Sequence, residues 1–143
     1  MKTTPVLMMV DDDLDDHELF VDALKIIDPG IPCISAFDCD DALDKLKKVE
    51  RLPDVIFLDI NMPRSGGHEC LTSIRKTANW LDIPVVIYST AYPHDAVETY
   101  KKLGATCLVI KPVFHVGIVQ VIELALQKNW QELEAHGLKN SKR

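Results

Sequence analysis

The stretch Asp54–Gly67 decides the fold, and it reads Asp-Val-Ile-Phe-Leu-Asp-Ile-Asn-Met-Pro-Arg-Ser-Gly-Gly. Its short apolar run, Val55–Leu58, is typical of a strand buried on both faces of a parallel sheet. Pro63 and the two glycines then end the strand and force a loop. Asp59 is therefore predicted at the carboxyl end of a central strand, where open α/β sheets bind ligands. A carboxylate there is most often a helix cap or a salt-bridge partner, and otherwise a nucleophile or a metal ligand.

Similar apolar runs occur elsewhere along the chain, and each is followed by apolar residues at helical spacing. The runs are Val6–Val10, Cys33–Phe37, Pro84–Tyr88 and Cys107–Ile110. The last helical pattern opens near His115 and continues to about Ala135. A strand–helix unit that occurs five times predicts an α/β fold, with a doubly wound five-stranded parallel sheet and helices on both faces.

Composition and charge exclude several functions. The 143 residues are 47% hydrophobic and 27% charged, which is ordinary for one globular domain. The net charge of −6 argues against nucleic-acid binding, because that function needs a basic face. No apolar stretch is long enough to cross a membrane, and the first residues lack the apolar region of a signal peptide. We expect a cytoplasmic protein.

The cysteines predict no special chemistry. Cys33, Cys39, Cys70 and Cys107 form no C-x-x-C pair, and all but Cys39 lie among apolar residues. We interpret these three as small core side chains of a reduced protein, without a zinc site.

Polar side chains follow four of the five predicted strands, at the same edge of the sheet. They are Asp11 and Asp12 after the first strand, Asp59 after the third, Ser89 after the fourth and Lys111 after the fifth. The second strand delivers none, so solvation of strand ends does not by itself explain the pattern.

Three carboxylates at one edge repel one another unless a cation compensates them. Mg²⁺ prefers one or two carboxylates together with carbonyl and water ligands. Asp12 and Asp59 are the expected direct ligands, Asp11 acts through water, and the backbone carbonyl of Asn61 is a third candidate. Magnesium held this openly typically binds phosphate oxygens.

Lys111 and Ser89 complete a site for a phosphoryl group. The lysine offers a point cation and the serine a hydroxyl donor to phosphoryl oxygens. With Asp59 as a carboxylate nucleophile, the reaction class is phosphoryl transfer to Asp59.

These motifs together resemble the receiver domain of two-component response regulators, which has a flavodoxin-like (βα)5 fold. The matching pieces are Val10-Asp11-Asp12, Leu58–Pro63 with Gly67, Ser89-Thr90, Gly104-Ala105 and Ile110-Lys111-Pro112. The resemblance covers about residues 5–128. Loop lengths and the tail are similar to single-domain receivers paired with phytochrome-type kinases.

The resemblance implies a signalling phosphoacceptor, not an enzyme. Asp59 would take phosphate from a histidine kinase or a histidine phosphotransfer protein and then act on a downstream protein target. Lys111 would sense the phosphoryl group, Ser89 would be the switch hydroxyl, and the Lys111–Pro112 peptide would be cis. Residues 1–128 would form the receiver domain, and 129–143 a helical extension with a polar tail. Because no output domain follows, we expect a stand-alone receiver.

Two positions depart from the family pattern. Leu108 stands where the fifth strand often carries Tyr or Phe, although Tyr88 or Tyr92 could substitute. Ala91, two residues after Ser89, offers no polar group to orient a hydrolytic water. We therefore expect the phosphoryl lifetime to depend mainly on Asn61 and on loop geometry.

Two other regions carry simpler expectations. Asp13, Asp15 and Asp16 are expected to cap and charge the first helix, and the five histidines to lie at the surface. The last helix is more apolar than one core-facing stripe requires, with only Gln120 and Glu123 polar between Val119 and Leu126. Its second face could form a homodimer or partner surface.

Three other functions compete with the switch. A Mg²⁺-dependent aspartyl-phosphate phosphohydrolase commonly has a second Asp two residues after its nucleophile, and this chain has Asn61. A flavin carrier of the same fold would need a Ser/Thr/Gly phosphate loop after the first strand, where this chain is acidic. An unphosphorylated interaction module would have no need of Asp59, Ser89 and Lys111 together.

Overall fold

A five-stranded parallel sheet forms the centre of the molecule, as the apolar runs predicted. The computed structural model describes residues 4–63 and 66–139. The strands are β1 (Leu7–Val10), β2 (Cys33–Ala36), β3 (Val55–Leu58), β4 (Val85–Ser89) and β5 (Cys107–Ile110). Their order, β2-β1-β3-β4-β5, places β1 beside β3, where the winding of the sheet reverses.

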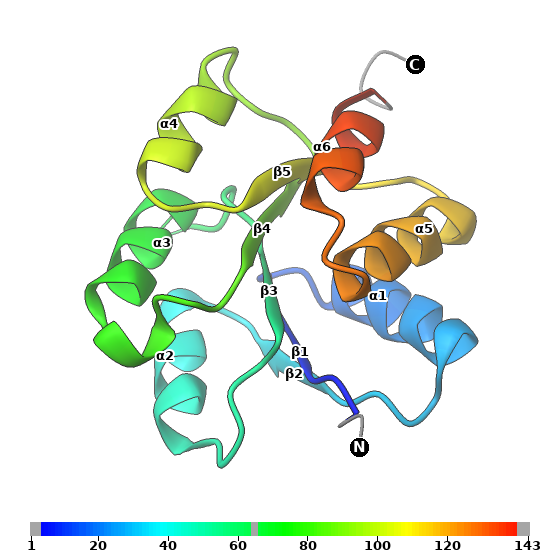
Figure 1. Cartoon of the computed structure of the whole chain (residues 1–143), viewed down its shortest axis with the longest axis horizontal. Coiled ribbons are helices and arrows are strands. Elements are labelled where there is room, and N and C mark those ends of the chain that lie inside the picture. The colour runs from blue at the N-terminus through cyan, green and yellow to red at the C-terminus, as the bar shows by residue number, and fades with distance from the viewer. Residues whose placement is uncertain (1–3, 64–65, 140–143) are drawn as a thin grey trace.

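Helices cover both faces of this sheet (Figure 1). They are α1 (Leu14–Ile27), α2 (Cys39–Lys48), α3 (Gly67–Lys76), α4 (Ala96–Lys102), α5 (His115–Leu126) and α6 (Trp130–Lys139), with a short 3₁₀ turn, η1 (Ala78–Trp80), after α3. Within the described part of the chain, no helix combines the length and apolar character needed to cross a membrane.

Two hydrophobic cores lie on opposite faces of the sheet. Alternate strand residues point to each side, so Met8 and Ile56 join the core under α2 and α3, whereas Met9 and Phe57 join the core under α1 and α5. The expected doubly wound fold is thereby confirmed, and the central strands lie between the two cores.

The last helix differs from its expected form. One helix was predicted from His115 to about Ala135, but the chain forms α5 and α6 with a break between them. Lys128 has a φ of 56° in this break, and the Asn129 side chain accepts a 3.4 Å hydrogen bond from the Glu132 N–H. The helix is therefore interrupted by Lys128, whose backbone is in the left-handed conformation, and α6 is capped by Asn129. Neither of the usual helix-ending residues, glycine or proline, occurs there.

Helix α6 folds back on the edge strand β5 (Figure 1). Leu133 is completely buried, and a Cβ on Gly137 would lie 2.9 Å from a methyl of Val109. The Glu134 carboxylate accepts a 3.0 Å hydrogen bond from the Leu108 N–H and pairs with Lys101 of α4 at 2.6 Å. Helix α6 also contacts α5. It therefore covers part of the apolar surface of α5, the helix that is more apolar than one core-facing stripe requires.

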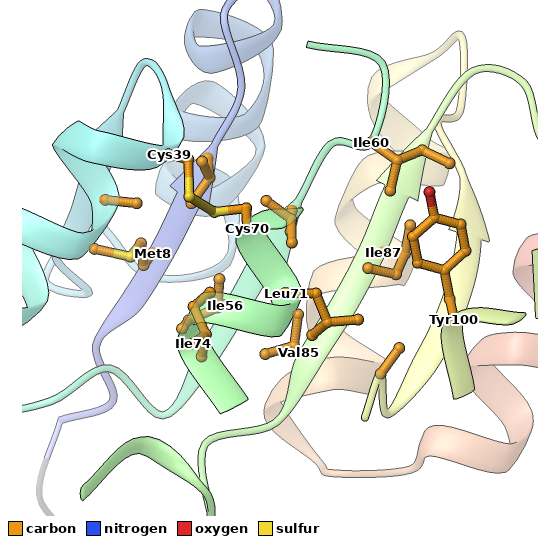
Figure 2. Close-up of a cluster of buried hydrophobic side chains, with 14 of the residues drawn as sticks. Met8, Cys39, Ile56, Ile60, Cys70, Leu71, Ile74, Val85, Ile87 and Tyr100 are labelled. Carbon is orange, nitrogen blue, oxygen red and sulfur yellow. A yellow bond between two sulfur atoms is a disulfide. The ribbon is translucent and has the colours of Figure 1, made fainter. Parts of the chain in front are cut away.

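The expectation for the cysteines was partly wrong, because Cys39 and Cys70 form a disulfide. Figure 2 shows this bond inside the core, joining the start of α2 to the first turns of α3. Their Cα atoms lie 5.5 Å apart, within the range that disulfides require. The two cysteines are 31 positions apart in the sequence, and no local pattern signals their pairing.

The two other cysteines are free, as expected. Cys107 is buried and Cys33 is half-buried in the core under α1 and α5. Burial raises the pKa of the Cys33 thiol to about 11 and that of the Cys107 thiol to about 12. Both therefore stay protonated at neutral pH and serve as small core side chains.

Candidate functional site

The acidic residues meet because β1 and β3 are neighbours in register. Val10 pairs with Leu58, so Asp11 and Asp59 leave adjacent strands at the same level. The Asp59 N–H donates to the Val10 carbonyl at 2.9 Å, and the Asp11 N–H donates to the Ala36 carbonyl at 3.0 Å. The sheet itself therefore fixes the positions of both aspartates.

Asp11, Asp12 and Asp59 form a group that fits a divalent cation. One carboxylate oxygen from each lies within 4.8 Å of the other two. Asp11 and Asp59 are buried and Asp12 is exposed, so the group opens to solvent on one side. Burial, and to a smaller extent the charge of Asp59, raise the pKa of Asp11 despite the nearby Lys111. Hard oxygen donors in a half-open, carboxylate-rich site are the ligands that Mg²⁺ prefers.

The Lys111 ammonium reaches across to these acids from the end of β5. Its Nζ lies 2.6 Å from Asp11 Oδ2, 2.7 Å from Asp16 Oδ2 and 3.2 Å from Asp59 Oδ2. Burial by itself lowers the pKa of Lys111, but the hydrogen bonds to Asp11 and Asp16 outweigh it and the net pKa is raised. The lysine is therefore charged throughout the physiological range.

Asn61 connects Asp59 to Ser89. Its backbone N–H donates to Asp59 Oδ1 at 3.0 Å. Its side-chain amide donates to Ser89 Oγ and, at 3.2 Å, to the carbonyl of Ala91. Ser89 is fully buried at the end of β4, so its hydroxyl is oriented by Asn61 beside the acidic group. The role of the Asn61 carbonyl as a metal ligand stays a prediction.

Gly67 permits the close packing of the loop after β3. A Cβ at this position would lie only 2.5 Å from Ile60 Cα, next to Asp59 in sequence. Only glycine therefore allows α3 to begin so close to the strand end. Arg64 and Ser65, between Pro63 and Gly66, lie outside the described residues.

Several expectations near the site need correction. The Lys111–Pro112 peptide is trans, because no cis bond occurs among the described residues. Asp13 does cap α1, accepting from the N–H groups of Asp15 and Asp16, but the Asp16 side chain binds Lys111 instead of only charging the helix end. Sequence reasoning missed this pair, whose two residues are 95 positions apart. The signal that could have found it is the position of Asp16, a carboxylate in the first turn of the helix that directly follows Asp11 and Asp12.

His17 is also not at the surface. It is 3% exposed, its ring packs at a tilt against that of Phe37, and its Nε2–H donates to the Asp11 carbonyl at 2.7 Å. This bond helps to hold the backbone that carries Asp11.

Neither Tyr88 nor Tyr92 occupies the fifth-strand position where the family often has an aromatic residue and this chain has Leu108. Leu108 is fully buried, and Tyr88 packs edge-on against Phe20 and Phe57 in the core. The Tyr92 hydroxyl lies against the carbonyls of Ile87 and Val109. Tyr92 therefore links the loop after Ser89 to the edge strand.

Comparison with known proteins gives a consistent result. A family model described as response regulator receiver domain matches residues 7–123. The chain is 36% identical over 115 residues to protein-glutamate methylesterase/protein-glutamine glutaminase 2 of Koribacter versatilis, covering 78% of this chain and 30% of that protein. It is 29% identical to sensory transduction protein LytT of Bacillus anthracis, covering 85% of this chain and 48% of that protein. The chain thus spans half or less of the length of these curated relatives.

Solved structures agree in fold. The chemotaxis protein CheY4 of Vibrio cholerae has a TM-score of 0.74 at 25% identity, covering 85% of this chain and 98% of that one. The bacteriophytochrome response regulator RtBRR has a TM-score of 0.70 at 30% identity, covering 85% and 77%. The phosphorylated cyanobacterial phytochrome response regulator RcpA has a TM-score of 0.77 at 24% identity, covering 90% and 95%, which supports the fold alone.

Proposed function

The chain belongs to the response regulator receiver family, and from this premise we propose that Asp59 is its phosphoacceptor. The donor would be the phosphohistidine of a histidine kinase or of a histidine phosphotransfer protein. One observation carries the proposal: the Asp59 carboxylate lies between the Lys111 ammonium and the backbone N–H of Asn61, beside two further acids. A buried carboxylate held this way is positioned for in-line attack and supported on both oxygens.

The transfer itself needs no additional protein nucleophile. An Asp59 oxygen attacks phosphorus, the P–N bond of the phosphohistidine breaks, and its electron pair stays on the imidazole nitrogen. Lys111 Nζ, 3.2 Å from Asp59 Oδ2, would donate to an oxygen of the arriving phosphoryl group. The Ser89 Oγ accepts a hydrogen bond from the Asn61 amide, and its own hydroxyl would donate to a second oxygen of the phosphoryl group.

We propose that Asp11, Asp12, Asp59 and the Asn61 carbonyl hold Mg²⁺. The bound ion would supply positive charge for the phosphoryl oxygens, as divalent ions do in phosphoryl transfer. The three carboxylates described above are available for it, and Lys111 already offsets part of their charge.

Several broader roles follow from the phosphoacceptor as proposals. The chain acts as a signalling switch and not as an enzyme, and a downstream protein reads the phosphorylated state in the cytoplasm. Residues 1–128 would form the receiver, and residues 129–143 an extension that begins with α6. A homodimer through the last-helix region would have α6 in its interface, because α6 contacts both α5 and β5. Light scattering that gives a monomer at all concentrations, with and without phosphorylation, would exclude the dimer.

The phosphoacceptor is tested by intact mass after incubation with phosphoramidate and Mg²⁺. Wild-type protein should gain one phosphoryl group, and EDTA or Asp59→Asn should prevent the gain. Asp95→Asn is a matched control, because this exposed aspartate makes no capping hydrogen bond at the start of α4. A gain that persists in Asp59→Asn, or continuous release of phosphate without accumulation, would contradict the proposal.

A further inference from the structure

All three N–H donors of the Lys111 ammonium have carboxylate partners. The partners are Asp11 at 2.6 Å, Asp16 at 2.7 Å and Asp59 at 3.2 Å. An ammonium group offers three donors and no more. When Asp59 is phosphorylated, the hydrogen bond that it accepts from Lys111 can pass to one oxygen of the phosphoryl group. A second phosphoryl oxygen can then receive a hydrogen bond from Lys111 only if Asp11 or Asp16 is released.

Asp16 is the partner that is released at least cost. Its side chain is 28% exposed, against 1% for Asp11. Across the described chain, Lys111 is the residue with which the Asp16 carboxylate forms an ion pair or hydrogen bond. A carboxylate that turns from Lys111 into water is solvated at once, whereas a buried carboxylate that loses its cation is left unpaired.

Asp16 also lies outside the acidic group. Asp11 and Asp59 belong to the cluster that fits a cation, but Asp16 comes from the first turn of α1. Its short contact to Lys111 is therefore not needed to assemble that cluster.

We propose that Asp16 is a positioning residue for Lys111. It holds the ammonium in the unphosphorylated protein and releases it to the phosphoryl group on Asp59. The inference rests on the proposed phosphoacceptor role of Asp59. By linkage, an interaction made only in the unphosphorylated state lowers the affinity of the site for a phosphoryl group, so removing it should favour phosphorylation.

The chain provides a matched control for this test. Asp15 is the adjacent aspartate, lies in the same first turn and is exposed, and Lys111 does not contact it. Asp15→Asn and Asp16→Asn remove the same charge from the same helix end, so general effects on Mg²⁺ affinity and net charge are shared. Asp16→Glu keeps the charge and restores the pair.

The first measurement is the rate of phosphorylation by phosphoramidate at saturating Mg²⁺, followed by intact mass. The Asp59 oxygen attacks the phosphorus of phosphoramidate, and the P–N bond breaks with its electron pair on nitrogen. The nitrogen leaves as ammonia and takes up a proton from solvent to become ammonium. For Asp16→Asn we expect a rise on the order of threefold to tenfold at low phosphoramidate, the usual size of coupling between paired residues. Asp15→Asn and Asp16→Glu should stay close to wild type.

The second measurement separates positioning from a structural role. The midpoint of thermal unfolding is recorded for each variant, alone and with Mg²⁺ and beryllofluoride, a phosphoryl mimic. If the pair exists only in the resting state, Asp16→Asn lowers the midpoint of the free protein but not that of the beryllofluoride complex. Equal loss in both states would mean a purely structural contact and overturn the proposal.

The remaining outcomes are also decisive. If Asp16→Asn is phosphorylated at the same rate as Asp15→Asn, or more slowly than wild type, the positioning role is overturned. Asp59 then still stands as the phosphoacceptor. Wild-type protein that takes no phosphoryl group would overturn both proposals together.

Discussion

Lys111 is the residue on which the charge balance of the site depends. Its side chain is 8% exposed and faces three carboxylates, Asp11 after β1, Asp16 in the first turn of α1 and Asp59 after β3. Because the fold raises the pKa of Lys111 above its ordinary value of 10.5, its contribution to stability is complete below that pH and is lost as the pH rises through the folded pKa. At neutral pH the cluster therefore keeps its cation.

Lys111→Met should destabilise the unphosphorylated protein in the absence of divalent ions. Removing one partner of a buried ion pair typically costs about 3–5 kcal/mol, because the remaining charges are uncompensated. Added Mg²⁺ should restore part of the loss in urea unfolding, since Asp11, Asp12 and Asp59 would then bind it more freely. Lys102→Met, which removes an exposed pair with Glu98, is the control. Unchanged stability of Lys111→Met without Mg²⁺ would contradict this charge balance.

Ala91 bears on the lifetime of the phosphoryl group. Its carbonyl accepts a hydrogen bond from the Asn61 amide, and its exposed methyl offers nothing to a water molecule. Ala91→Glu should accelerate autodephosphorylation by about tenfold or more, up to the roughly 10²–10⁴-fold that a well-positioned acid–base group supplies. The decay of phosphorylated protein, followed by intact mass, gives the rate. An unchanged rate would show that the residue at this position does not limit hydrolysis, and Ala91→Gln would separate polarity from charge.

At the scale of elements, the disulfide joins α2 and α3 on one face of the sheet. Figure 2 places it in the same core as Ile56, Leu71 and Ile74. Both half-cystines are buried, with Cys39 3% exposed and Cys70 completely enclosed. The bond thus restrains the helix that follows Asp59 without contacting the acidic group directly.

Reduction of this bond should lower the free energy of unfolding by about 3–4 kcal/mol for a loop of this length. The measurement is urea unfolding with and without dithiothreitol. A Cys39→Ala/Cys70→Ala double variant should not respond to the reductant. Alkylation of denatured, unreduced protein should modify Cys33 and Cys107 only, and modification of all four cysteines would contradict the disulfide.

At the scale of the whole molecule, α6 closes the exposed edge of the sheet. Edge strands offer unpaired N–H groups to other chains, and proteins commonly cover them. Here Glu134 accepts a hydrogen bond from the Leu108 N–H, and Leu133 is fully buried in the core under α1 and α5. The extension is therefore part of the packed structure over its described length.

Leu133→Ala should loosen α6 from β5. Truncating a buried leucine costs about 2–5 kcal/mol, and much of that loss should appear as local opening of the last helix. Hydrogen exchange of the Leu108 amide should become faster in this variant. Gln131→Ala changes an exposed residue of the same helix and should leave the exchange rate unchanged. Protection of Leu108 that survives Leu133→Ala would mean that α6 does not protect the edge strand.

The sequence predicted the fold well because its strands are fully apolar runs that end in loops. It also predicted which residues meet at the sheet edge, since parallel strands bring their carboxyl ends together. What it missed depends on contacts between distant segments. The Asp16–Lys111 and Cys39–Cys70 pairs join residues 95 and 31 positions apart, and hydrophobic periodicity does not indicate which distant residue each one meets. The break before α6 has no glycine or proline, and the apolar residues around it continue at helical spacing.

The central claim, that Asp59 receives the phosphoryl group, is tested most directly by locating that group. Borohydride reduces an aspartyl phosphate to homoserine, so the modified position can be read from peptide masses. Phosphorylated protein should contain homoserine at position 59 and at neither Asp11 nor Asp12, which lie in the same cluster. Homoserine at one of those two aspartates, or none at position 59 in protein that carries the phosphoryl mass, would contradict the account.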